Sequence, residues 1–422
     1  MVRYFLRLAA RNLWRRPRRT VLTFLAVAVG LWYFIFLDSF LQGLGRDSVR
    51  NLVELETSHV RIHAAGYWDK RDELPLDPLI ERPRDIVRRV AAVPGVEGAT
   101  PRLVFAAQLN NGVDELPVTA VGIDPQADGR VFSLEKYVVQ GRWPQPHDEA
   151  MGPGVAQAML GKAVAELMGL GVGDTFTLVT RTRSGAMQAI DLQVAGLLDS
   201  PHPGVNASTV YLPLQAAQLA LGVGDAATEV DIRGTGEGHA AALQSEIEQT
   251  VGARAQPALS VHAWQAMAQD VLAMIQAERA YDMVFLALVF VIALVGVVNT
   301  VLLATLERTR EIGTLKAMGM TTREIAGVFM AEAGLVGVLG GVTGVAAAMA
   351  TEFWFVNYGL DLTPLLRDVD VGYPLSGVFT GAWNPVTMAG AFLFGVAVCL
   401  VASALPARRA ARLDAAAALR NL

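Results

Sequence analysis

The sequence has a single cysteine in 422 residues, and only 18% of its residues are charged. One cysteine excludes an intrachain disulfide, so an exported domain of this chain must be held together by its core alone. Average soluble domains carry ~25% charged residues, whereas 53% of the residues here are hydrophobic. The shortage of charge therefore indicates that part of the chain lies in lipid.

Catalytic motifs are missing as well. The sequence contains neither a G-x-S-x-G nucleophile turn nor an H-E-x-x-H zinc motif. At Gly161–Ala163, "GKA" lacks the first glycine of a phosphate loop, since position 156 is Ala, and no hydroxyl residue follows the lysine. His59 and His63 lie in a strand-like segment without a third ligand nearby, which favours a solvated or packed pair over a metal site. We expect no catalytic residue, no metal and no cofactor.

Long apolar runs predict four membrane-spanning helices. A span takes about 20 residues, and only a helix satisfies its own backbone groups in lipid. The predicted spans are residues 20–42, 281–306, 325–356 and 385–405. The first has the basic front and apolar middle of a signal peptide, but no small-residue cleavage site follows it, so we interpret it as an uncleaved anchor.

The placement of arginine and lysine predicts the orientation, because these residues favour the cytoplasmic side of a span. Basic residues gather before the first span, in segment 307–324 and in tail 406–422, whereas loop 357–384 is acidic. We therefore expect both termini and segment 307–324 in the cytoplasm, and region 43–280 and loop 357–384 outside. Arginines at every fourth position from Arg3 to Arg15 also predict an amphipathic helix over residues 1–19, suited to anionic headgroups.

The external region 43–280 is long enough for one or two folded domains. Its helical ends predict a stalk, and two strand–helix–strand units predict a split ferredoxin-like sandwich. Glycine-punctuated strands between them predict an inserted β-rich subdomain over about 131–228, with a short helix around Ala156–Met168. The expected fold class is an α+β membrane protein, with four transmembrane helices and a large extracytoplasmic α/β domain between spans one and two.

A charged segment between the second and third predicted spans is the main candidate for binding a partner. On a helix its apolar residues make one ridge, its polar residues spread around the remaining surface, and a glycine ends it. This pattern favours a docking helix at 307–324 over a polar loop on the headgroups. The residues concerned are Arg310, Glu311, Ile312, Thr314, Leu315, Lys316, Met318 and Gly319.

Two further sets of side chains lie within the predicted spans. Glu332 follows the start of the third span by about two turns, so its carboxyl group is expected to face the interior of the bundle. Its role is either a structural bond between helices or a moving part. The outer ends of spans one and two carry large apolar side chains that suit acyl chains, although ordinary packing explains each equally well. They are Phe34, Phe36, Phe40, Met283 and Phe285.

The stretch "LERTREIGTLKAMGMTTREIAGVFMAEAGLVGVLGGVTG" closely resembles the signature of FtsX-like ABC-transporter permeases, which include lipoprotein-releasing and macrolide-efflux types. The segments "AARNLWRRPRRTVLTFLAVAVG", "VVQGRWP" and "LPARRAARLDAAAALR" extend the resemblance over nearly the whole chain. In the tail, Ala415 and Ala417 stand where the family usually has proline and glutamate, so no contact ascribed to that glutamate is carried over.

The resemblance implies a multi-pass protein of the inner membrane in which segment 307–324 is a coupling helix docked on a separate ABC ATPase subunit. It also implies a second permease copy or paralogue, and no nucleic-acid partner. The run "NLVELETSHVRIHAAGYWDKRDE" looks more like the lipoprotein-releasing branch, so extraction of lipoprotein or lipid from the outer leaflet is the first expectation. The alternatives are a macrolide or peptide efflux pump that spans the envelope, and a module that activates a periplasmic hydrolase.

Overall fold

The computed structural model describes residues 9, 11, 17–144, 155–252, 258–269, single positions between 272 and 298, 314, 316–362 and 378–411. It divides into two units, each built from segments that are distant in sequence. We call the first the membrane unit: Met1–Gly45, Ile275–Leu360 and Phe379–Leu422. We call the second the sheet domain: Arg46–Met274 and Asp361–Val378.

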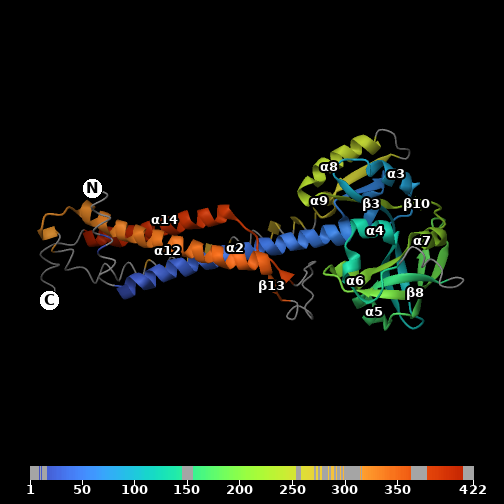
Figure 1. Cartoon of the computed structure of the whole chain (residues 1–422), viewed down its shortest axis with the longest axis horizontal. Coiled ribbons are helices and arrows are strands. Elements are labelled where there is room, and N and C mark those ends of the chain that lie inside the picture. Colours follow the sequence, from blue (N-terminus) through green and yellow to red (C-terminus); the bar gives the residue numbers. More distant parts are fainter. Residues whose placement is uncertain are drawn as a thin grey trace. The chain divides into compact units, whose positions relative to one another are not determined.

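The apolar runs of the membrane unit form long helices (Figure 1). They are α2 (Pro17–Leu52), α12 (Thr322–Tyr358) and α14 (Pro385–Ala411), and the short strands β13 (Leu360–Asp361) and β14 (Val378–Phe379) pair between the last two. Over the described residues, three helical stretches are long and apolar enough to cross a membrane: Thr20–Thr57, Thr322–Tyr358 and Pro385–Ala404. The predicted span 281–306 lies mostly outside the described residues, so the count of four stays a prediction.

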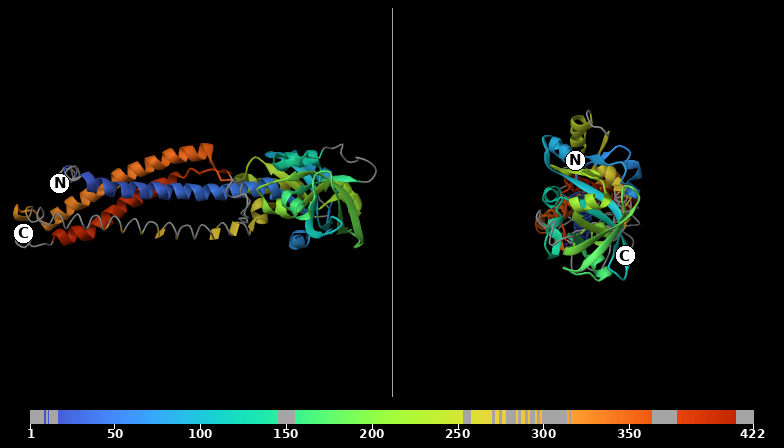
Figure 2. Two further views of the ribbon diagram at one scale, coloured as in Figure 1. Left: turned by 90° about the horizontal axis from the view of Figure 1, so that it is seen from below. Right: turned by 90° about the vertical axis from the view of Figure 1, so that its right-hand side faces the viewer.

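Glycines bring α12 close to both partner helices, α2 and α14, which lie in the same bundle in the left view of Figure 2. A Cβ atom added to Gly344 would lie 2.7 Å from the carbonyl oxygen of Ala28 in α2, and Gly340 faces α2 in the same way. Gly337 and Gly341 face α14, where an added Cβ would meet side-chain atoms at 3.0 and 2.8 Å. Helices in lipid gain little from burying apolar surface, so close backbone approach at small residues is what holds such a bundle together.

The sheet domain is built on a ten-stranded sheet in the order β12-β1-β11-β3-β4-β9-β6-β8-β5, with β7 paired to β3 and β8. The strands are β1 (Val60–Ala64), β3 (Val96–Asn110), β4 (Glu115–Ile123), β5 (Val138–Gly141), β6 (Ala156–Gly161), β7 (Thr175–Arg181), β8 (Met187–Leu198), β9 (Thr209–Pro213), β11 (Glu229–Gly234) and β12 (Leu259–Ala263). A separate pair comprises β2 (Ile80–Glu81) and β10 (Ala226–Ala227).

Short helices and turns cover this sheet (Figure 1). The α-helices are α3 (Pro83–Val90), α4 (Pro125–Val131), α5 (Lys162–Met168), α6 (Pro203–Ser208), α7 (Leu214–Leu221), α8 (Ala240–Ile247) and α9 (Trp264–Met267). The π-helical and 3₁₀ turns are η1 (Val53–Thr57), η2 (Trp68–Glu73), η3 (Leu134–Tyr137), η5 (Glu237–His239) and η6 (Glu248–Gly252).

Strands β12, β1, β11 and β3 are antiparallel neighbours that bring the two strand–helix–strand units of the sequence together. Val60 and Ile62 of β1 and Ile232 of β11 share one buried core with residues of α3 and α8. Since successive side chains of a strand point to opposite faces, Arg61 and His63 lie on the face away from these helices.

The remaining strands close into a barrel. The pairings run β3-β4-β9-β6-β8-β7 and return to β3, where Ala107 of β3 is in register with Thr180 of β7. Closure leaves no strand edge within this ring of six strands, whereas β5 lies outside the ring and pairs with β8. Alternate residues of β3, including Phe105 and Leu109, enter the barrel's apolar core. The 15-residue β3 therefore belongs to both parts of the domain.

One local expectation was wrong. Residues Ala156–Gly161 form β6, and only Lys162–Met168 is helical. The first half is a strand because it pairs with β8 on one side and β9 on the other. Its apolar residues are buried in the barrel, a long-range arrangement that local periodicity does not encode.

Candidate functional site in the membrane unit

Helix α12 begins at Thr322 because Thr321 and Glu324 form a capping box. The Thr321 amide donates to Glu324 Oε2 at 2.8 Å, and the Glu324 amide donates to Thr321 Oγ1 at 3.4 Å. Just before the cap, Gly319 has a φ of 92°, a left-handed conformation that ends a helix. Its amide donates to the Lys316 carbonyl at 2.9 Å. The cap and the glycine together fix a change of chain direction at the start of α12.

The predicted docking segment is described only at this end. Thr314 and Met318 are exposed, and 69% of the surface of Met318 is accessible to solvent, whereas Lys316 is half-buried. Thr314 and Met318 belong to one helical turn, since the Met318 amide donates to the Thr314 carbonyl at 3.0 Å. Four of the predicted residues lie outside the described residues: Arg310, Glu311, Ile312 and Leu315. The apolar ridge therefore stays a prediction, of which the structure places Met318.

Two carboxyl groups are buried along α12. Glu332 is 8% exposed, and Glu352 is 1% exposed. Among the described residues, Glu352 Oε2 has no hydrogen-bond partner. An ionisable group buried within a membrane helix is costly and is a functional candidate by default. Sequence reasoning missed Glu352, although a single acid within the run "MATEFWF" was a usable signal.

The aromatic side chains near the end of α12 form one cluster. Phe36 and Phe40 of α2 lie 5.5 and 6.0 Å, ring centre to ring centre, from Phe355 of α12, and Phe40 lies 5.8 Å from Phe379. Phe34 is half-buried beside the core shared by α2, α12 and α14. The structure thus brings Phe36 and Phe40 together and adds Phe355 and Phe379, which were not identified from the sequence.

Met283 and Phe285, the other predicted lipid contacts, lie outside the described residues. Their contact with acyl chains therefore stays a prediction.

Polar contacts tie the middle of α2 to the segment that leads into α14. Asp38 Oδ2 accepts hydrogen bonds from Gln42 Nε2 at 2.8 Å and from Asn384 Nδ2 at 3.2 Å. The Ala382 amide donates to Ser39 at its side-chain and carbonyl oxygens, at 3.1 and 3.2 Å. With the glycine contacts, these bonds attach α2 to α12 and α14 at several levels.

In the part of the chain that the structure describes, no group of three or more His, Cys, Asp or Glu residues is placed to hold a metal ion. His59 is buried, and His63 stacks on Tyr67 with ring centres 4.7 Å apart. His63 Nε2 lies 3.5 Å from Glu229 Oε2.

Known proteins similar to this chain fall into one group. The chain is 22% identical over 408 residues to the lipoprotein-releasing system transmembrane protein LolC of Xylella fastidiosa strain Temecula1, a match covering 94% of this chain and 92% of that protein. It is 24% identical to the macrolide export ATP-binding/permease protein MacB of Shewanella sp. strain ANA-3, covering 95% of this chain but 58% of MacB.

A shorter match is 38% identical over 125 residues to the pyoverdine export ATP-binding/permease protein PvdT of Pseudomonas entomophila, covering 30% of this chain and 16% of PvdT. The chain thus spans less than two thirds of the MacB and PvdT relatives. Two family models match it, the MacB-like periplasmic core domain at residues 20–250 and the FtsX-like permease C-terminal model at residues 283–415. With these two matches, the chain belongs to the FtsX-like permease family and carries a MacB-like periplasmic core domain.

Proposed function

We propose that this chain is the permease subunit of an ABC transporter, which couples ATP hydrolysis on a separate ATPase subunit to movement of the sheet domain outside the membrane. The observation that carries the proposal is the start of α12. An exposed turn with Met318 at its end precedes a capped helix, and that helix contacts both α2 and α14 through glycines. Force applied at the turn therefore enters the helix that touches the rest of the bundle.

We further propose that the substrate is a lipoprotein or lipid drawn from the outer leaflet of the inner membrane. The support is that the match to LolC runs over almost the full length of both chains. The second candidate, macrolide or peptide efflux, is supported by the MacB-like core domain and by the match to MacB. Proteoliposomes that hold the permease and its ATPase distinguish the two: release of a labelled lipopeptide supports the first, and transport of a macrolide supports the second.

The partners in this proposal are an ABC ATPase subunit on the cytoplasmic face and a second permease, identical or paralogous. Both termini lie in the cytoplasm, as the arginines before α2 and in the tail suggest. Activation of a periplasmic hydrolase would use the same transmission without transport. It predicts an unchanged lipopeptide content in the proteoliposomes during ATP turnover.

The docking segment provides the direct test. Burying a Leu or Met side chain is worth ~1.5–3 kcal/mol, and ~1.4 kcal/mol is a factor of ten in affinity. Leu315→Asp and Met318→Asp should therefore each lower binding of the ATPase by about tenfold or more. Lys316→Ala should cost less and change mainly the salt dependence. The measurement is the amount of ATPase that co-purifies with each variant, with its ATP turnover in liposomes.

Val113→Asp is the matched control, because Val113 is an exposed apolar side chain of the sheet domain, with 88% of its surface exposed. The same charge placed there should leave ATPase binding unchanged. If Leu315→Asp and Met318→Asp both co-purify with as much ATPase as the wild type does, segment 307–324 is a loop rather than a docking helix. The proposed coupling between ATPase and membrane helices would then be wrong.

A further inference from the structure

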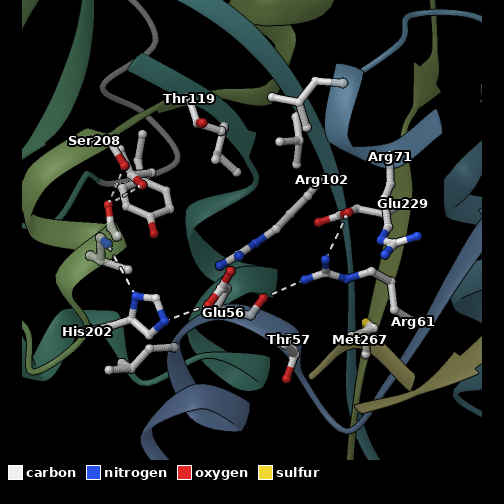
Figure 3. A pocket seen from close by; sticks show the side chains of 18 of the residues that line it. Glu56, Thr57, Arg61, Arg71, Arg102, Thr119, His202, Ser208, Glu229 and Met267 are labelled. Atoms are coloured by element: carbon white, nitrogen blue, oxygen red, sulfur yellow. Dashed lines mark hydrogen bonds and ion pairs between the residues drawn. The ribbon is translucent and has the colours of Figure 1, made fainter. Parts of the chain in front are cut away.

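The sheet domain contains a pocket of about 360 Å³ that none of the predicted sites includes (Figure 3). Its walls come from the η1 turn, from β1 and β11 of the antiparallel part, and from β3, β4 and β9 of the barrel. Alternation along the strands explains the lining. Residues such as Val104 and Thr119 point outward because their neighbours Phe105 and Ala120 point into the barrel core.

Arg102 lies in the middle of this pocket (Figure 3). Its Nε and Nη2 donate to the two carboxylate oxygens of Asp128 at 2.7 and 2.9 Å, and its guanidinium lies 3.3 Å from the ring centre of Phe132. Asp128 is fully buried and does not line the pocket. Asp128 therefore holds the Arg102 guanidinium through two of its nitrogens, from the side away from the pocket. Neither of these bonds uses Nη1.

Arg61, a second arginine of the pocket with 16% of its side chain exposed, has all three of its nitrogens engaged. Nε donates to Asp231 Oδ1 at 2.6 Å, Nη1 lies 3.3 Å from Glu229 Oε2, and Nη2 donates to the Glu56 carbonyl at 2.5 Å. Opposite charges on paired strands favour this register, since Arg61 and Asp231 are cross-strand partners. Arg61 thus holds η1 against β1 and β11, and the Glu229 carboxylate lies between Arg61 and His63 in the pocket wall.

The carboxylate of Glu56 has a side-chain partner as well. Its Oε2 lies 2.5 Å from His202 Nε2, and the two side chains meet at the lower edge of the pocket in Figure 3. With Glu56 at His202 and Glu229 at Arg61, two further guanidinium groups line the pocket: Arg102, whose Nη1 is not used by Asp128, and Arg71 at the rim. Arg71 Nη1 donates to the Trp68 carbonyl at 3.1 Å and Nε lies 3.8 Å from Asp72 Oδ1, so neither of these contacts uses its Nη2.

Arg71 is held over an aromatic surface. Its guanidinium carbon lies 4.6 Å from the ring centre of Trp68, and Trp68 stacks on His262 with ring centres 3.9 Å apart. The Arg71 side chain is 46% exposed. Behind it, His63 is buried and its Nδ1 has no hydrogen-bond partner among the described residues. Burial and the charge of Arg61 lower the pKa of His63 to about 3, so its ring is neutral at neutral pH.

The opposite wall is apolar and hydroxylated. Val104 and Val121 line the pocket with apolar surface, and Thr119, Ser208 and Tyr211 line it with hydroxyl groups. Thr119 and Ser208 lie across the pocket from Arg71 in Figure 3. Pockets that take small organic ligands measure ~300–1,000 Å³ and combine an apolar lining with a few convergent polar groups. This pocket has that size, and its lining is more polar than apolar.

We infer that the pocket binds a small organic anion, whose carboxylate or phosphate oxygens contact Arg102 and Arg71 and whose apolar part lies against Val104, Val121 and Trp68. Guanidinium groups bind such oxygens with strong, charge-assisted hydrogen bonds. The bound anion also touches Leu55 and Thr57 of η1, the turn that directly follows α2. A ligand in the pocket therefore contacts the turn between α2 and the sheet. This contact does not depend on which substrate the chain moves through the membrane.

Binding is tested on the full chain in lipid nanodiscs by fluorine NMR of 4-fluorophenyl phosphate and 4-fluorobenzoate, with 4-fluorobenzyl alcohol as the uncharged analogue. Both anions should bind and the alcohol should not. The tighter anion identifies the ligand class as a phosphate or a carboxylate. Arg71→Ala should weaken binding by about threefold to tenfold, as loss of one partly exposed charge-assisted hydrogen bond would. Thr119→Phe, which fills the pocket, should abolish binding.

Arg183→Ala is the matched control. Arg183 is an arginine of the same domain with 42% of its side chain exposed, and it pairs with Asp77 away from the pocket. This variant should bind the anions like the wild type. Equal binding of the alcohol and the anions, or a loss with Arg183→Ala that equals the loss with Arg71→Ala, would overturn the inference. If Thr119→Phe fails to fold, the comparison of the two arginine variants decides alone.

Discussion

Two residues of β1 contact acidic side chains: Arg61 lies between Asp231 and Glu229, and His63 lies against Glu229. Burial, together with the charge of Arg61, lowers the pKa of His63 to about 3, whereas burial raises the pKa of Asp231 to about 6 although Arg61 opposes it. Unfolded His and Asp titrate near ~6.5 and ~3.9. As pH falls from about 6.5 to about 3, the unfolded state takes up the His63 proton first, so this residue makes acid destabilising.

Asp231 acts in the opposite direction, because the native state takes up its proton first between about pH 6 and pH 4. Its contribution to stability is present below about pH 4 and is lost as pH rises through 6. Each unmatched proton changes the free energy of unfolding by about 1.4 kcal/mol per pH unit. Between about pH 4 and pH 6 the slopes from His63 and Asp231 have opposite signs and cancel. The free energy of unfolding of the wild-type domain should therefore depend little on pH through these two groups.

Replacing one residue should reveal the slope of the other. With His63→Gln, the free energy of unfolding should fall as pH rises from about 4 to about 6. With Asp231→Asn, which keeps an acceptor for Arg61, it should fall as pH drops below about 6.5. Urea unfolding of the full chain at several pH values measures both slopes. Two variants with the same sign of slope would contradict the assignment.

At the scale of elements, the glycine face of α12 sets how closely the membrane helices pack. Gly344 has no room for a side chain, since an added Cβ would lie 2.7 Å from the Ala28 carbonyl oxygen. Gly344→Ala must therefore push α2 and α12 apart, at a cost of about 1–3 kcal/mol for overpacking. Gly390 of α14 is the matched control, because a Cβ there meets nothing within 4 Å. Gly390→Ala should be neutral.

The chain provides its own probe for this experiment. Cys399, the single cysteine, is buried in α14 at the Gly337 contact. The temperature at which its thiol reacts with a fluorogenic maleimide in detergent therefore reports opening of the bundle. Gly344→Ala should lower that temperature, and Gly390→Ala should leave it near the wild-type value. Equal temperatures for both variants would show that the glycine contact does not limit the packing.

Elements differ in how far the sequence determines them. Helices α12 and α14 follow from unbroken apolar runs, and the strands β1, β11 and β12 follow from alternation, since both signals are local. The barrel does not, because its closure pairs β3 with β7 across about 70 residues, and no local pattern states which strands meet. The β6 segment was misread for the same reason.

The same limit explains the functional side chains that were missed. Arg102 and Asp128 look like ordinary surface charges in sequence, and only the fold buries them as a pair. Gly161, which resembles part of a phosphate loop, is a glycine because an added Cβ would lie 2.2 Å from the Asn206 carbonyl oxygen. In each case the deciding contact lies distant in sequence. By contrast, a turn signal and an apolar run mark Met318 and Glu332 locally, and the burial expected of Glu332 is found, at 8% exposure. Their roles stay predictions.

At the scale of the whole molecule, the proposed transmission requires that the start of α12 and the sheet domain lie on opposite sides of the membrane. The arginine distribution supports this orientation, since positive residues stay on the cytoplasmic side. Thr321, at the α12 cap, and Asp225, just before β10, are both exposed. They are therefore suitable positions for a matched pair of single cysteines in a Cys399→Ala background, where no other thiol remains.

Asp225→Cys should react with a membrane-impermeant maleimide in spheroplasts whose outer barrier has been opened, whereas Thr321→Cys should react only after the membrane is made permeable. Because both positions are exposed, protection of one of them reports the bilayer rather than burial in the protein. The reverse pattern would place the α12 turn outside, out of reach of a cytoplasmic ATPase, and the coupling mechanism would fail with it. Labelling of both sites in intact spheroplasts would instead mean that α12 does not begin at the cytoplasmic face, and the route from Met318 through the glycine contacts to α2 would lose its starting point.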